Sequence, residues 1–138
     1  MTISMKCISL KQPYAELLAI GKKTIESRKW STSYRGDFLI HASKPIDTEA
    51  CDFYKINITT VATGAIIGKA SLCGVKKYMG NQEFALDRDK HFSLKKILNN
   101  CCMYGFLIKD AVKFDKPIPY LGKLGFFDVC DSDVWFVI

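Results

Sequence analysis

Residues 21–30, GKKTIESRKW, combine the residue types that bind phosphates and nucleobases. The segment holds four basic residues, one carboxylate and an indole in ten positions. Cationic side chains bind phosphate oxygens, and an unpaired base can stack on the flat rings of Trp30 and Tyr34, a contact worth about 1–3 kcal/mol. We therefore expect a nucleic-acid-binding surface here. Its candidate residues are Lys22, Lys23, Glu26, Arg28, Trp30, Tyr34, Arg35 and Lys44.

Several of these residues also have a purely structural interpretation. Glu26 either orients the Arg28 guanidinium and accepts a hydrogen bond from an exocyclic amine, or forms with Arg28 a buried ion pair that only fixes the fold. Trp30 fits the core, because tryptophans are mostly buried. His41 lies on an apolar segment and is interpreted as a hydrogen-bonded histidine of the core or of a cleft wall. Arg35 is interpreted as part of a turn. The residue types alone leave these alternatives open.

The charge balance favours a polyanionic partner. The chain carries a formal net charge of +6 and has a pI near 9.0. The basic excess is concentrated between residues 6 and 44, where eight Lys and Arg residues accompany three acidic ones. A basic patch is the usual electrostatic signature of nucleic-acid binding. The expected partner is RNA or single-stranded DNA, with a protein complex as a further possibility.

The six cysteines bear on compartment and metal binding. The first residues, MTISMKCISL, show no charged leader before a long apolar run, and no apolar stretch reaches the roughly 18 residues of a membrane span. We expect a cytoplasmic protein with reduced thiols and no membrane contact. The chain has no C-x-x-C pair and no H-x3-5-H spacing, so neither a metal nor a cofactor is expected.

The first half of the chain must position the basic cluster. The pattern predicts a helix that begins at Gln12-Pro13 and is ended by Gly21, whose glycine suits a left-handed cap. Residues 24–30 alternate as a strand does, which places Glu26, Arg28 and Trp30 on one face. The remaining predictions are strands at 6–10 and 37–42, a polar loop at 31–36, and a short helix at 47–55 capped by Asp47 or Thr48.

The second half reads mainly as strands. Residues 64–78 are expected to form a long strand whose glycines at 64, 68 and 74 mark bends or bulges. The other expectations are a helix and a loop within 81–99, a strand at 103–114, a tight connection bracketed by Pro117 and Pro119, and strands at 122–129 and 134–138. Many short strands with few helices predict an α+β, mainly β fold, namely a small β-barrel with a few flanking α-helices. An open α+β sandwich is the alternative, and residues 1–138 are expected to form one domain.

Two stretches, SLKQPYAELLAIGKKTIESRKW and RGDFLIHASKP, resemble the activating signal cointegrator homology (ASCH) domain. The family pattern runs S-L-x-Q-P-x-A-x-L-L, then G-x-K-x-x-E-x-R-x-W, then R-G before an apolar strand. The C-terminal half is similar more loosely, through IIGKASL, YGFLI and KPIPYLGKLGFFDV. The matching positions are Ser9, Leu10, Gln12, Pro13, Ala15, Leu17, Leu18, Gly21, Lys23, Glu26, Arg28, Trp30, Arg35 and Gly36.

The resemblance implies a PUA-like β-barrel with a cleft beside the first helix that takes nucleic acid or a nucleobase. Family members are associated with RNA binding and with transcription- or translation-linked complexes. The expected function is therefore a non-catalytic nucleic-acid-binding module, most suited to single-stranded RNA. A protein-interaction module of such a complex is an alternative, since fold alone does not fix function.

An enzymatic alternative also follows from the resemblance, because some bacterial members hydrolyse acylated cytidine and others cleave RNA. For an amidohydrolase acting on N4-acetylcytidine, or for a ribonuclease, the catalytic candidates are Lys23 and Glu26. The amidohydrolase branch is similar at Lys23 but has a threonine three residues later, where this chain has Glu26. Its later acidic residue has no secure counterpart, and Glu83 is the nearest downstream carboxylate.

Overall fold

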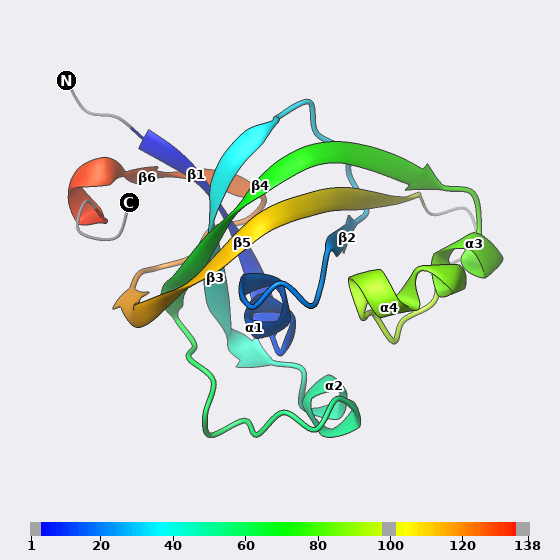
Figure 1. Cartoon of the computed structure of the whole chain (residues 1–138), viewed down its shortest axis with the longest axis horizontal. Coiled ribbons are helices and arrows are strands. Elements are labelled where there is room, and N and C mark those ends of the chain that lie inside the picture. Colours follow the sequence, from blue (N-terminus) through cyan, green and yellow to red (C-terminus); the bar gives the residue numbers. More distant parts are fainter. Residues whose placement is uncertain (1–3, 98–101, 135–138) are drawn as a thin grey trace.

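The computed structural model describes residues 4–97 and 102–134 (Figure 1). Its strands are β1 (Ser4–Gln12), β2 (Ile25–Arg28), β3 (Gly36–Ile46), β4 (Ala65–Tyr78), β5 (Met103–Pro119) and β6 (Phe126–Cys130). Its helices are α1 (Tyr14–Ala19), α2 (Thr48–Phe53), α3 (Asn81–Leu86), α4 (Arg88–His91) and the 3-10 helix η1 (Asp131–Asp133). Within the described residues, no helix is both long and apolar enough to cross a membrane.

The strands form one strongly curved sheet in the order β2-β5-β4-β3-β1-β6 (Figure 1). Among the described strands, only β1 and β3 pair in parallel, and the other neighbours are antiparallel. The prediction of a mainly β, α+β, PUA-like fold is confirmed, but the sheet is not closed into a barrel. Aromatic side chains bridge its two edges instead, because Trp30, just after β2, contacts Phe106 edge-on at 5.2 Å and Phe126 of β6 at 5.9 Å between ring centroids.

Helix α1 lies in the concave side of the sheet (Figure 1), where it packs against β1, β3, β4 and β5. Its apolar residues are buried there, and Gly21 follows it with a φ of +83°, as expected for a glycine that ends a helix. Gly68 on β4 lets the helix approach, because a Cβ at this position would lie 2.5 Å from the Val112 carbonyl oxygen and 3.3 Å from the Cβ of Ala19. The predicted bends at glycines 68 and 74 coincide with register shifts between β4 and β5.

Two sequence predictions in the C-terminal half are wrong. Pro117 and Pro119 do not bracket a tight connection, since β5 continues to Pro119. The register pairing with β2 ends at Leu107, and the Ile108 N–H still donates to the Thr24 carbonyl oxygen. Among the described residues, no strand pairs with this outer edge of β5 further on, so the edge can accept prolines, which lack an N–H. Residues 122–125 are a loop, and β6 begins only at Phe126. The strand predicted at 134–138 falls almost entirely outside the described residues.

Candidate nucleic-acid-binding site

A cavity of about 790 Å³ opens between β1, β2, β3, the segment after α4 and the loop formed by residues 120–125. We call this last segment the 120–125 loop. Among the residues that the structure describes, the lining contains seven basic side chains and a single carboxylate, that of Glu26. The basic residues are Lys11, Lys23, Arg28, Lys29, Lys44, Lys95 and Lys123. A cavity of this size is within the range of small-ligand sites, and its charge suits an anionic ligand.

Lys23 forms part of the cavity floor and is only 2% exposed. Its Nζ donates hydrogen bonds to the carbonyl oxygens of Ile25 at 2.7 Å and His91 at 2.6 Å, and lies 3.1 Å from Glu26 Oε1. An ammonium group has three donors, and these three acceptors engage all of them. Burial lowers the pKa of Lys23, while the Glu26 carboxylate opposes that shift. The lysine is therefore held firmly in place.

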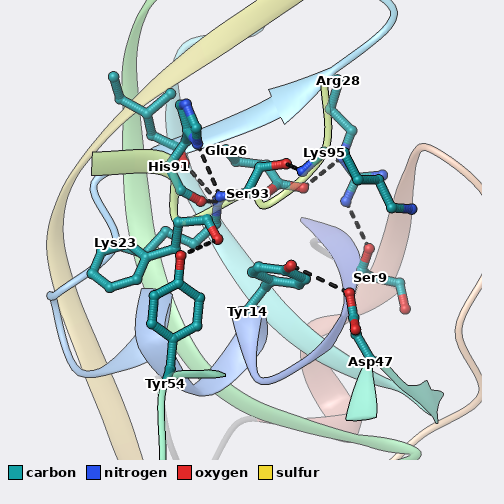
Figure 2. A network of polar contacts seen from close by, with 12 residues as sticks. Ser9, Tyr14, Lys23, Glu26, Arg28, Asp47, Tyr54, His91, Ser93 and Lys95 are labelled. Carbon is teal, nitrogen blue, oxygen red and sulfur yellow. Dashed lines mark hydrogen bonds and ion pairs between the residues drawn. The ribbon is translucent and has the colours of Figure 1, made fainter. Parts of the chain in front are cut away.

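Glu26 joins Lys23 to Arg28 (Figure 2). Its second carboxylate oxygen accepts a hydrogen bond from Arg28 Nε at 2.6 Å. Burial alone would raise the pKa of Glu26, but the Arg28 and Lys23 cations outweigh it and hold the pKa below its usual range. Arg28 Nη2 donates to the carbonyl oxygen of Ser9 at 2.7 Å, which ties β2 to β1. The buried ion pair expected as the structural alternative is thus present, and it forms one wall of the cavity.

Tyr14 of α1 also lines the cavity, although sequence reasoning did not select it as a site residue. Lys23 Nζ lies 5.6 Å from the centre of its ring, and the Tyr14 hydroxyl donates to Asp47 Oδ2 at 3.3 Å (Figure 2). Burial and the neighbouring Asp47 carboxylate raise the pKa of Tyr14, so the phenol stays protonated. The only local indication for Tyr14 was its place on the apolar face of the predicted helix, and this place is equally typical of a residue that packs in the core.

The remaining predicted residues divide into two groups. Trp30 and Lys44 line the cavity, whereas Lys22 borders a separate hollow beside α1. Tyr34 donates its hydroxyl to the Asp37 carbonyl oxygen. Arg35 donates to the Thr32 and Tyr34 carbonyl oxygens, at 3.1 and 2.7 Å, and so makes a turn.

For the amidohydrolase alternative, the structure does not bring the nearest downstream carboxylate close to Lys23. Glu83 lies on α3, outside the cavity lining, where its carboxylate accepts a hydrogen bond from the Met79 amide at 3.2 Å. Lys95, Lys123 and the 120–125 loop reach the cavity instead. The spacing within residues 21–30 does not indicate these residues, because they come from segments far from it in the chain.

A mainly β sheet curved around one helix, with a cavity beside that helix, is the PUA-like type of fold. The chain belongs to the ASCH domain family, whose sequence pattern matches residues 8–111. No curated protein matches the chain in sequence.

Solved structures of ASCH from Zymomonas mobilis are similar to this chain in fold. One has a TM-score of 0.69 and 16% identity, with 94% of this chain and 90% of that chain covered. Two mutants of the same protein, a serine-to-alanine and a tyrosine-to-phenylalanine variant, give the same score and identity. The serine mutant is matched over 96% of this chain and 92% of its own. The tyrosine mutant is matched over 96% of this chain and 94% of its own. At this identity the likeness establishes the fold alone.

Proposed function

We propose that the cavity binds single-stranded RNA, with one base inside it and the neighbouring phosphates on its rim. The observation that carries the proposal is the charge of the lining. Glu26, the one carboxylate in the described part of the lining, is already paired with Lys23 and Arg28. Five exposed lysines remain around the opening, and we call them the rim lysines. They are Lys11, Lys29, Lys44, Lys95 and Lys123.

The rim lysines are available for phosphate. Within residues 4–97 and 102–134, none of them forms an ion pair with a carboxylate. Exposed ammonium groups bind phosphates as point charges on flexible stems, so a single strand lying across the opening can meet several of them at once. Such contacts give affinity without reading sequence.

The interior suits a nucleobase better than a second phosphate. Trp30 and Tyr14 supply aromatic surface, while Leu10 and Met103 add apolar surface. A base inserted among aromatic and apolar side chains gains stacking energy. Lys23 is committed to three acceptors, so in this proposal it holds the floor of the cavity and makes no phosphate contact.

Fluorescence anisotropy of labelled single-stranded RNA, duplex RNA and single-stranded DNA, titrated over a range of salt concentrations, tests the proposal. We expect the tightest binding for single-stranded RNA, with a log–log salt slope of about −0.7 per phosphate contacted. No binding of any of the three at low salt would overturn the proposal. Hydrolysis of an acylated nucleoside, or co-purification of one specific protein, would then support the corresponding alternative.

A further inference from the structure

We propose that Ser9 and His41 form a nucleophile and general-base pair on the wall of the cavity, suited to cleaving a carboxylic ester of a phosphate-bearing molecule. Ser9 Oγ lies 2.7 Å from His41 Nδ1, and His41 Nε2 lies 2.7 Å from the carbonyl oxygen of Tyr120. A carbonyl oxygen only accepts, so Nε2 carries the proton. In the neutral ring Nδ1 then holds a lone pair, and the Ser9 hydroxyl donates to it. A serine hydrogen-bonded in this sense is poised to lose its proton to the ring.

The pair is rigidly placed and faces the cavity. Ser9 and His41 are register partners on the parallel strands β1 and β3, and both line the cavity. His41 is buried, whereas Ser9 is half-buried and keeps a surface toward the opening. Arg28 Nη2 is hydrogen-bonded to the Ser9 carbonyl oxygen at 2.7 Å, which brings a guanidinium next to the serine.

The 120–125 loop covers the pair at Gly122. A Cβ at this position would lie 2.6 Å from His41 Cε1 and 3.0 Å from Ser9 Oγ, closer than real Cβ contacts, so glycine is needed for this approach. Within the described part of the chain, the Gly122 amide donates no hydrogen bond. In this proposal the Gly122 N–H, on the loop that packs against the pair, is the candidate donor for the oxyanion that forms when a hydroxyl attacks a carbonyl.

The proposed reaction has two steps. Ser9 Oγ attacks the ester carbonyl carbon while its proton passes to His41 Nδ1; the bond to the alcohol oxygen then breaks, and the leaving alcohol takes the proton from His41. Water next attacks the acyl-Ser9 ester and gives its proton to His41. When the acyl–Oγ bond breaks, the proton returns to Ser9 Oγ, and a carboxylic acid is released. Water is the only co-reactant.

The structure favours an ester over an amide. The third member of the arrangement is the Tyr120 carbonyl oxygen, and a neutral carbonyl stabilises an imidazolium less than the carboxylate of a complete triad does. A weaker base suits an ester, whose alcohol leaves more easily than an amine. The rim lysines favour a substrate that carries phosphate, such as a nucleotide with an acylated sugar hydroxyl. The inference shares the cavity of the proposed function but does not depend on RNA binding.

The test is covalent labelling of the intact protein with a fluorophosphonate probe, followed by mass spectrometry of its peptides. We expect one adduct, on Ser9, and none in Ser9→Ala. Ser43→Ala is the matched control, because Ser43 lines the same cavity and has no histidine partner among the described residues; its labelling should equal that of the unaltered chain. His41→Gln should slow labelling about a hundredfold or more, the usual contribution of a general base.

A second measurement keeps the inference separate from folding and from RNA binding. Hydrolysis of p-nitrophenyl acetate should fall to background in Ser9→Ala, a variant that removes one oxygen atom and whose circular dichroism spectrum should be unchanged. Absence of the Ser9 adduct in folded protein, or equal labelling of Ser9 and Ser43, would overturn the inference even if RNA still binds. Labelling of Ser9 without RNA binding would overturn only the proposed function.

Discussion

Lys23 and Glu26 face each other at 3.1 Å in a place where water hardly reaches either of them. Their exposed fractions are 2% and 8%, and Arg28 completes the group from the side of the cavity. A buried charge is tolerated only while its partners are present. The floor of the cavity therefore depends on all three side chains together.

The first prediction concerns removal of the buried ammonium. Lys23→Ala leaves Glu26 with one cation fewer and the carbonyl oxygens of Ile25 and His91 without their donor. We expect the free energy of unfolding to fall by about 3–5 kcal/mol, measured by urea denaturation. Lys22→Ala, at the exposed neighbouring position, should change it by no more than about 0.5 kcal/mol. Equal effects of the two variants would contradict the structural role of Lys23.

The second prediction concerns pH. His91 is buried, its Nε2 donates to the Phe84 carbonyl oxygen at 2.7 Å, and its Nδ1 accepts from the Ser93 amide. Burial lowers the pKa of His91 below its ordinary value. A group with a lowered pKa in the folded state stabilises the fold fully above its ordinary pKa, about 6.5 for histidine, and loses that contribution as pH falls through the folded value.

We therefore expect the free energy of unfolding to decrease from pH 7 to pH 5, with a slope of at most about 1.4 kcal/mol per pH unit from this one group. Urea denaturation at a series of pH values measures it. His91→Gln keeps an N–H donor but does not titrate, so its slope over this interval should be smaller. An identical slope in the variant would show that His91 is not the group responsible.

The third prediction concerns the close approach of the 120–125 loop. Gly122→Ala places a methyl group against the buried His41 ring, so the loop must shift or the ring must move. We expect a loss of about 1–3 kcal/mol in stability, typical of overpacking, measured by thermal or urea unfolding. Gly80→Ala is the matched control, because a Cβ there meets nothing within 4 Å. A comparable loss in both variants would argue against a specific contact at Gly122.

The fourth prediction concerns the rim lysines in RNA binding. Lys44→Ala and Lys123→Ala should each weaken binding of single-stranded RNA and reduce the magnitude of the salt slope by about 0.7, the value for one lost phosphate contact. Arg35→Ala removes a positive charge outside the cavity lining and should leave the slope unchanged. Anisotropy titrations over a range of salt concentrations compare the three. A slope that changes equally in all three would point to diffuse attraction by net charge.

Local rules explain how much of the fold could be predicted. Asp47 caps α2 as expected, accepting a hydrogen bond from the Ala50 amide at 3.0 Å, because a cap needs only residues three apart. The alternation along β2 correctly placed Glu26 and Arg28 on one face, where they form their ion pair. The predictions of helix α1 and of the glycine that ends it also depended only on neighbouring residues.

The cavity depends on contacts that no local pattern encodes. Lys23 donates to the carbonyl of a residue 68 positions away, and the ring of His41 meets a carbonyl 79 positions away. Tyr34, which was predicted to offer a stacking surface, packs its ring at 5.5 Å from that of Phe126, a neighbour that comes from the last strand. Spacing in the sequence indicated the chemistry of the cluster, whereas the sheet decides which of its members share a cavity.

The pairing of β1 with β6 has a consequence for synthesis on the ribosome. Strand β1 is made first, yet one of its two edges is covered only by β6, and Phe126 of that strand stacks on Phe106 with ring centroids 6.2 Å apart. A nascent chain that has not yet released residues 126–130 from the exit tunnel must leave both an open backbone edge and an unfinished aromatic cluster exposed. A chain in this partly synthesised state is therefore open to wrong strand pairing and to aggregation at this edge.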